Sequence, residues 1–185
     1  MVKLKEVAKS MTRQNHSFKV TDTYTIYGSL TAGTDLMEGI LEECRKHNIR
    51  SGVVTCIGSL QKVGYVLFTT VNGEPSGYGK EIVINNPVEL VNGTGFICED
   101  EQNNLDLHLH GLVAEKEGTL NAGHFVRGLN PILVTVEFSI TYGKEIRASR
   151  TFDKDLGFRV INFTKEGRKM LGDIRFIGEK NTRSV

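Results

Sequence analysis

The sequence predicts one α/β domain of the α+β kind, in which a single main helix packs on a mixed, largely antiparallel β-sheet. Three observations predict this fold class. The 185 residues suit one domain with a sizeable core. The 20 glycines separate many short segments, and there are only 3 prolines, as is typical of a strand-rich fold. A single stretch has a strong helical period. We expect this domain to span residues 21–178, between an N-terminal extension (1–20) and a mobile tail (179–185).

The clearest helix is predicted over residues 34–48, "TDLMEGILEECRKHN". Thr34 or Asp35 can cap its N-terminus, and Asn48 is a suitable stop signal. Its glutamates precede its basic residues, which is the order that the helix dipole favours. One face of this helix is apolar, because residues of that type recur at helical spacing: Leu36, Met37, Ile40, Leu41 and Cys44.

Most of the remaining segments are predicted to be strands. The run at 52–59 is small and apolar throughout, a pattern typical of a strand that is buried on both faces. The segment 72–80, "NGEPSGYGK", is predicted to be a loop. After residue 158 we expect a short strand, a helical turn near 165–171 and a last strand. The other predicted strands are 23–30, 62–70, 81–85, 87–99, 105–114 and 131–143.

The composition is that of an ordinary globular protein, with 39% hydrophobic and 24% charged residues. No apolar run is long enough to cross a membrane, and no apolar segment of the secretory type follows the N-terminal lysines. We therefore expect a cytoplasmic protein without a membrane partner. Cys44, Cys56 and Cys98 are odd in number and lack Cys-x-x-Cys spacing, so buried thiols are predicted rather than disulfides or a zinc knuckle.

The charge is distributed unevenly. The net charge of +1 predicts no strong non-specific binding to nucleic acid. Residues 144–185, however, hold eleven Lys and Arg against six Asp and Glu. This basic C-terminal stretch fits either a surface that faces phosphates or a solvated rim.

Three of the five histidines lie within residues 105–124, "LDLHLHGLVAEKEGTLNAGH". His108 and His110 are two apart in a predicted strand and point to the same side, as does Asp106. A turn at 114–118, ending in Gly118, can return the chain and bring His124 beside them. Three neutral imidazoles are suitable ligands for Zn²⁺ or another divalent transition metal, and they leave one coordination position open. On spacing alone, the more common case is that His108 and His110 are solvated residues of a polar strand face and that His124 is a hydrogen-bonded turn residue.

Other chemistry is less well supported. The sequence has no Gly-x-Ser-x-Gly elbow, no phosphate-binding loop and no dinucleotide fingerprint, which argues against those enzyme classes. Glu137 lies mid-strand among apolar residues, so it is either salt-bridged or a general base near a metal. Asp106 is a second candidate base, and Arg127 or Arg150 could hold an anionic substrate.

Several of these segments together resemble a known family. The stretches "YGSLTAGTDLMEGILEECRKHNIRSGVVTCIGSL", "PVELVNGTGFI", "LHLHGLVAEKEGTLNAGH" and "ILVTVEFSI" are similar to the plants-and-prokaryotes-conserved (PPC) domain, which also occurs in plant AT-hook nuclear proteins. The similarity covers about Tyr24 to Ile140, and "SRTFDKDLGFRVINF" resembles the end of the family's pattern. The chain is thus similar to stand-alone prokaryotic members.

The resemblance implies a compact homotrimer in which His108, His110 and His124 hold a zinc ion near a subunit interface. It also implies DNA as a partner, although none of the three prolines follows the Arg-Gly-Arg triplet of an AT-hook. Three residues depart from the family pattern: Ala122 replaces the first glycine of Gly-Gly-His, Phe125 replaces the leucine that is common after the histidine, and Arg127 stands at a commonly acidic position. The hypotheses left open are a DNA-binding or regulatory module, a metal-dependent enzyme, and a scaffold that traps metals adventitiously.

Overall fold

The computed structural model describes residues 15–165. Its elements in chain order are β1 (Tyr24–Thr31), α1 (Leu36–Lys46), β2 (Gly52–Leu60), β3 (Val63–Val66), β4 (Phe68–Val71), β5 (Glu74–Tyr78), β6 (Ile82–Ile84), β7 (Val88–Glu99), β8 (Leu105–Ala114), β9 (Leu120–Phe125), β10 (Ile132–Tyr142), β11 (Ile146–Asp153) and β12 (Phe158–Lys165).

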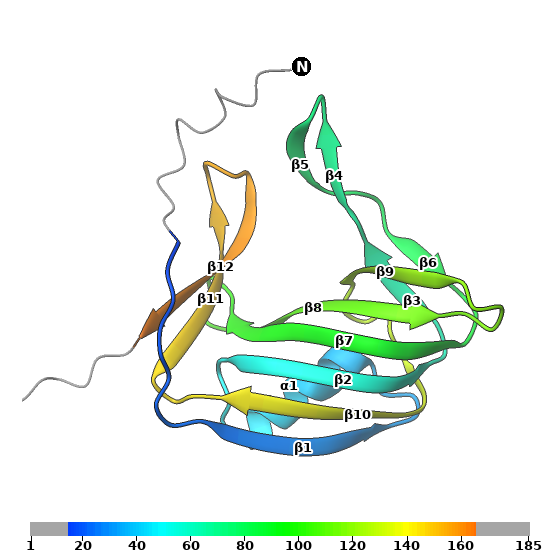
Figure 1. Ribbon diagram of the computed structural model, residues 1–185, viewed down its shortest axis with the longest axis horizontal. Helices are drawn as coiled ribbons and strands as arrows, with labels where there is room; N and C mark the ends of the chain where they lie inside the picture. Colours follow the sequence, from blue (N-terminus) through cyan, green and yellow to red (C-terminus); the bar gives the residue numbers. More distant parts are fainter. Residues whose placement is uncertain (1–14, 166–185) are drawn as a thin grey trace, which may run out of the picture.

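Within these residues, ten strands form one sheet, in which the path β1-β10-β2-β7-β8-β9-β3-β6 is extended by β11 and β12 at β7. The strand pairs of this sheet are antiparallel except for one parallel bridge between β11 and β7. β4 and β5 form a separate hairpin that stands away from the sheet (Figure 1). Together with α1 on one face, this arrangement confirms the predicted fold class. In the described part of the chain no helix has the length and hydropathy to span a bilayer.

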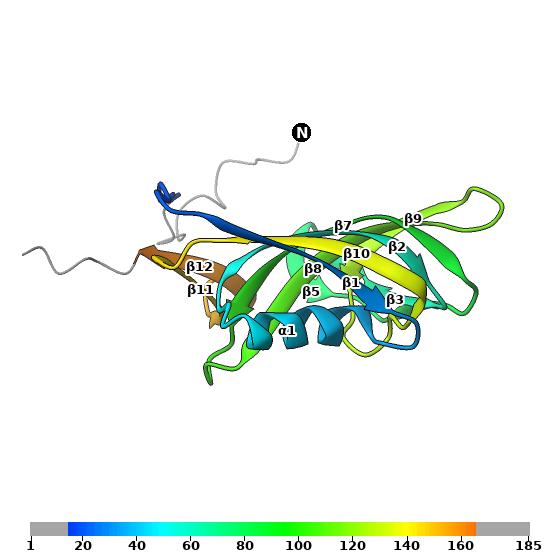
Figure 2. The ribbon, with the colours of Figure 1, turned by 90° about the horizontal axis from the view of Figure 1, so that it is seen from below.

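The helix forms where its sequence predicts it. The side chain of Asp35 accepts hydrogen bonds from the backbone N–H groups of Met37 and Glu38, both at 3.1 Å, so Asp35 is the N-cap. Asn48 ends the helical segment with a positive φ of 55°. The predicted apolar stripe is buried, and α1 lies against one face of the sheet (Figure 2).

The two faces of the sheet have different surroundings. Leu107 and Leu109 belong to the core between α1 and the sheet. The opposite face, which we call the open face, carries Tyr27, Val53 and Ile57, and their exposed fractions are 84%, 36% and 57%. The prediction that the strand at 52–59 is buried on both faces is therefore wrong for the isolated chain, because α1 covers only one of them.

Several other predictions differ from the structure. The predicted loop at 72–80 contains β5, and the predicted strand at 62–70 is interrupted at Leu67 between β3 and β4. Strand β11 has no counterpart among the predicted strands. The helical turn near 165–171, the last strand and the tail at 179–185 fall wholly or almost wholly outside the described residues, so the domain boundaries remain predictions. The three cysteines are buried and free, as predicted.

The β11–β12 hairpin is fastened to the sheet by a buried carboxylate. Glu99 ends β7, and its side chain is only 3% exposed. One of its oxygens accepts from Nε of Arg50 at 2.6 Å, and the other accepts from Nη2 of Arg147 at 2.6 Å. Burial alone would raise the pKa of Glu99, but the two guanidinium groups outweigh it and hold that pKa below its ordinary value. Glu99 therefore stays ionised at neutral pH and joins β7 to β11 and to the segment before β2.

We expect Glu99→Gln to lower the free energy of unfolding by about 2 kcal/mol at pH 7, because it weakens hydrogen bonds to charged partners. A carboxyl whose pKa is lowered by folding stabilises the protein above its unfolded pKa of about 4.3 and loses this effect as the pH falls through the folded value. Urea denaturation should therefore show the difference between wild type and variant shrinking below about pH 4. Glu42→Gln, at an exposed ion pair, is the control and should change stability by less than about 0.5 kcal/mol. A difference that persists at pH 2 would contradict this account.

Candidate metal centre

Strand alternation places two histidines side by side. Along β8, Leu107 and Leu109 are buried toward α1, so His108 and His110 point to the open face. Their ring centroids are 5.0 Å apart, and their Nε2 atoms are 3.0 Å apart. The same-side arrangement predicted from the sequence is confirmed.

The return strand supplies the third imidazole. The turn after β8 closes with the N–H of Gly118 donating to the carbonyl of Glu115 at 2.8 Å, and Gly118 has a φ of 84°, which suits glycine. The register then pairs His110 with His124. On the other side of β9, Gly123 allows the close approach of β3, because a Cβ there would lie 2.4 Å from the ring of Tyr65. One possible ligand nitrogen from each of the three histidines lies within 4.8 Å of the others.

The three imidazoles are held in their neutral form. Burial, followed by the charge of Arg150, lowers the pKa of His108 to about 4. Burial, followed by the proximity of His108, lowers the pKa of His124 to about 3, and the pKa of His110 is also lowered, mainly by burial. Neutral rings retain the lone pairs that a metal ion needs, so all three are ready as ligands at neutral pH.

Two further observations fit a metal ion. Nδ1 of His108 is buried and has no hydrogen-bond partner within residues 15–165, which is unusual for a ring nitrogen. A tetrahedral zinc ion with Zn–N bonds of about 2.0–2.1 Å holds its nitrogens about 3.4 Å apart. Here the Nε2 atoms of His108 and His110 are 3.0 Å apart, and all three candidate nitrogens lie within 4.8 Å of one another. The donor set therefore suits Zn²⁺ or a similar borderline cation, and the three-ligand pattern is that of an open site.

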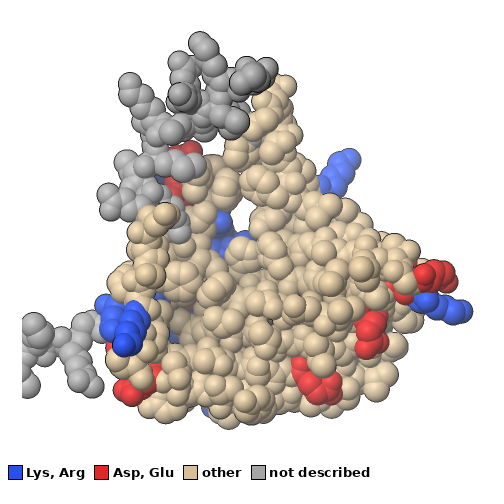
Figure 3. All heavy atoms as spheres, viewed as in Figure 1, with Lys and Arg blue, Asp and Glu red and all other residues tan. Residues whose placement is uncertain are grey.

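The histidines face a cavity of about 470 Å³. Its walls include Val66, Leu67 and Phe68, which are apolar. Tyr78, from β5, stacks on His124 with centroids 4.6 Å apart, and its hydroxyl lies 3.3 Å from Nδ1 of His124. In Figure 3 the molecule is hollowed between the β4–β5 and β11–β12 hairpins. Tyr78 is not among the residues predicted from the sequence, because the segment that carries it has the composition of a loop.

Two of the other predicted residues lie beside the trio. Asp106 precedes His108 on the same face of β8, and its Oδ2 accepts from Nη1 of Arg150 at 3.3 Å. The side chain of Arg150 is 13% exposed, and its Nε is buried without a hydrogen-bond partner among the described residues. After burial, the positive charge of Arg150 is a further cause that lowers the pKa of all three histidines, so Arg150 lies within electrostatic range of them.

The structure places the remaining two candidates elsewhere. Arg127 forms an ion pair with Glu38 of α1. Glu137 is exposed on β10, where it accepts a hydrogen bond from Ser29 at 3.3 Å. Strands β2 and β7 lie between β10 and β8, which puts Glu137 roughly 14 Å from the histidine strand. Within one chain, neither residue joins the three histidines.

Solved structures share this fold at low sequence identity. A candidate DNA-binding protein from Bacteroides thetaiotaomicron is 24% identical, with a TM-score of 0.63 over 79% of this chain and 95% of its own. A plant- and prokaryote-conserved protein from Pyrococcus horikoshii is 20% identical, with a TM-score of 0.64 over 80% of this chain and 96% of its own. A metal-containing protein from Archaeoglobus fulgidus is 18% identical, with a TM-score of 0.62 over 80% of this chain and 98% of its own.

The sequence itself identifies the family. No curated protein matches the chain. The family model described as the "Plants and Prokaryotes Conserved (PCC) domain" matches residues 18–142, which is more than half of the chain and includes all three histidines. The chain therefore belongs to the Plants and Prokaryotes Conserved domain family, the PPC family that its sequence resembles.

Proposed function

We propose that this protein is a homotrimer whose His108, His110 and His124 bind Zn²⁺ or another divalent transition metal, at a centre that receives a small anionic ligand. The carrying observation is the convergence of three neutral imidazoles at one wall of a 470 Å³ cavity. A bound ion of this kind supplies Lewis acidity and lowers the pKa of a coordinated water. The A. fulgidus protein of similar fold is described as metal-containing, which supports the proposal.

Two residues beside the histidines, Arg150 and Asp106, are proposed to act on the ligand. Arg150 is paired with Asp106 through a 3.3 Å contact, and its buried Nε has no hydrogen-bond partner among the described residues. We assign Arg150 to the anionic group of the ligand and Asp106 to orienting Arg150 or accepting a proton. Glu137 and Arg127 would reach a centre only from a neighbouring subunit. Whether the ligand is a substrate or an effector decides between an enzyme and a sensor.

The open face supports the trimer. Tyr27, Val53, Ile57 and Phe96 are exposed there, and a broad exposed apolar area is typical of an interface. The apolar pattern of residues 52–59 also suits a strand whose second face is covered by another subunit. The three free, buried cysteines suit a reducing cytoplasm.

DNA binding is the second candidate. It is supported by the names of similar folds from B. thetaiotaomicron and from Ralstonia eutropha, both of which are candidate DNA-binding proteins. The basic stretch at 144–185 supplies charge that could meet phosphates. A trimer would multiply weak contacts of this kind.

Removing the imidazoles should remove the metal. We expect purified wild type to contain about one divalent ion per chain and His108→Ala/His110→Ala to contain less than about a tenth of that, because one imidazole cannot hold the ion alone. Elemental analysis after dialysis measures both. His47→Ala, at the C-cap of α1, is the matched control. Equal metal content in the double variant and wild type would refute the centre, and content that varies between preparations would indicate adventitious metal.

The trimer is tested by mass in solution. Light scattering coupled to gel filtration should give about 62 kDa, three times the chain mass of 20.6 kDa. Ile57→Lys should shift the protein toward 20.6 kDa, because it places a charge in the apolar area of the open face. Lys154→Gln, at the tip of the β11–β12 hairpin, should leave the mass unchanged. A monomeric wild type would remove the trimer from the proposal.

DNA binding is tested by its salt dependence. If each of three subunits contacts at least one phosphate, the slope of log K against log salt on a duplex should be about −3 or steeper. Fluorescence anisotropy between 50 and 300 mM KCl, roughly the range in which such slopes are resolved, measures it. A flat dependence, or no binding at 50 mM, argues for the small-ligand function alone.

A further inference from the structure

The cavity beside the three histidines offers few polar groups to a ligand. Apart from the histidines, the one lining residue with a polar side-chain atom is Tyr78. Its hydroxyl already lies 3.3 Å from Nδ1 of His124. A ligand with several hydroxyl or amide groups would leave most of them without partners, and unpaired polar groups that are taken out of water cost free energy. The cavity therefore does not suit sugars or other polyhydroxylated ligands.

Four rings are in contact in a continuous row that begins at the histidines. Tyr78 stacks on His124, with the ring centroids 4.6 Å apart. Phe68 meets Tyr78 edge to face at 6.1 Å, and it meets Phe158 of β12 in the same way at 5.4 Å. The row thus connects the β4–β5 hairpin to the β11–β12 hairpin, on either side of the hollow in Figure 3.

The aromatic side chains that line the cavity are incompletely covered. Phe68 is 49% exposed and Tyr78 is 41% exposed, and Leu67 between β3 and β4 is 48% exposed. Covering apolar and aromatic surface favours binding, and a further ring can pack on the edge or face of these two. This wall therefore suits an apolar, aromatic part of a ligand.

The polar side of the cavity suits one negative charge. None of the residues that line it is acidic. Arg150, which lies beside the histidines, is paired with Asp106, but its buried Nε has no hydrogen-bond partner within residues 15–165. A guanidinium N–H and a divalent ion are both partners that a carboxylate accepts readily, and a carboxylate presents two oxygens.

We propose that the ligand of this cavity is an aromatic carboxylate, an inference that rests on the metal centre proposed above. Its carboxylate contacts the histidine centre and Arg150, and its ring packs against Phe68 and Tyr78. The cavity volume of about 470 Å³ lies within the range of about 300–1,000 Å³ that is typical of sites for whole organic molecules. A two-carbon carboxylate would leave the aromatic wall uncovered.

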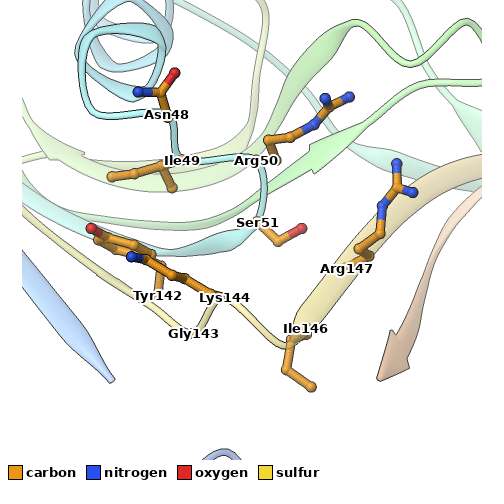
Figure 4. A pocket seen from close by; sticks show the side chains of 9 residues that line it. All are labelled: Asn48, Ile49, Arg50, Ser51, Tyr142, Gly143, Lys144, Ile146 and Arg147. Atoms are coloured by element: carbon orange, nitrogen blue, oxygen red, sulfur yellow. The ribbon is translucent and has the colours of Figure 1, made fainter. Parts of the chain in front are cut away.

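A second cavity provides an internal comparison. It has a volume of about 240 Å³ and lies beside Arg50 and Arg147 (Figure 4). Lys144 extends away from these two arginines, and no phenylalanine lines the cavity. A carboxylate that is attracted only by surface charge would bind here as readily as at the histidines. The amides of Ser51 and Gly143, which line this second cavity, report on such binding.

The inference is tested by titrating full-length, isotope-labelled protein with phenylacetate, acetate and 2-phenylethanol at constant ionic strength. The protein is loaded with Zn²⁺, its metal content is measured, and backbone amides are followed by NMR. We expect phenylacetate to shift the amides of Phe68, Tyr78 and Ala122. Its dissociation constant should be about ten-fold or more below those of the other two probes, because acetate lacks the ring and 2-phenylethanol lacks the carboxylate.

A variant of the aromatic wall tests the role of the ring. Phe68→Ala should weaken phenylacetate binding about five-fold or more and change acetate binding by less than about two-fold, because only phenylacetate contacts this side chain. Val71→Ala is the matched control on the same hairpin, since Val71 is 61% exposed and does not line the cavity. It should leave the binding of both probes unchanged. Both side chains lie outside the buried core, so these truncations leave the main sheet intact.

Several results would overturn the inference. They are equal affinities for acetate and phenylacetate, equal effects of Phe68→Ala and Val71→Ala, and shifts at Ser51 and Gly143 as large as those at Phe68. Phenylacetate affinity that is unchanged in His108→Ala/His110→Ala would overturn the placement of the carboxylate at the histidines.

The metal content separates this inference from the proposed function. If the protein holds zinc but shows no preference for phenylacetate over acetate, the metal centre stands and the aromatic ligand is refuted. If the protein holds no zinc, the metal centre fails, and the same titration on metal-free protein still decides the inference. A preference for phenylacetate over both other probes that depends on Phe68 would then support it, and the lack of such a preference would overturn it.

Discussion

Within residues 15–165, the structure depends on a single helix that covers only one face of a wide sheet. Because side chains alternate along a strand, every strand that buries one set of residues against α1 must present the other set to the open face. β8 shows the consequence directly. Leu107 and Leu109 anchor the strand in the core, and this burial fixes His108 and His110 outward. A slip of one residue would exchange the two sets, so the packing of the core determines where the histidines lie.

Local patterns in the sequence predict the parts of this protein that local physics determines. The helical period, the capping Asp35 and the alternation of β8 all act within a few residues, and each prediction is confirmed. The position of His124 beside the other two histidines depends on one short turn, so it could also be predicted from the sequence. The exposure of Val53 and Ile57 on β2 could not be predicted in this way, because the burial of a strand face depends on what packs against it. Helix α1 packs against the other face of β2.

Other features of the site depend on contacts between distant segments. Tyr78 precedes His124 by 46 residues and reaches it only because the β4–β5 hairpin leaves the main sheet. A run with three glycines, a serine and a proline is typical of a loop. The pairing of Thr69 with Gly77 that makes it a hairpin is not visible in either segment alone. Similarly, Arg127 and Arg150 are equal candidates in the sequence. An ion pair with Glu38 engages the first, and a 3.3 Å contact with Asp106 places the second beside the histidines.

The strand β11 joins the Glu99 ion pairs to the histidine site. Arg147 and Arg150 are three residues apart, an odd spacing that directs their side chains to opposite faces of the strand. One therefore joins Glu99 at the end of β7, and the other joins Asp106 beside the histidines. A single backbone bridge, from Ser149 to Glu99, pairs β11 with the main sheet. Ion pairs thus hold the strand where hydrogen bonds between backbones are few. Removing Glu99 or Asp106 would loosen the hairpin, and removing Asp106 would also change the electrostatic field at the histidines. The stability of the hairpin and the electrostatics of the histidine site are therefore coupled through β11.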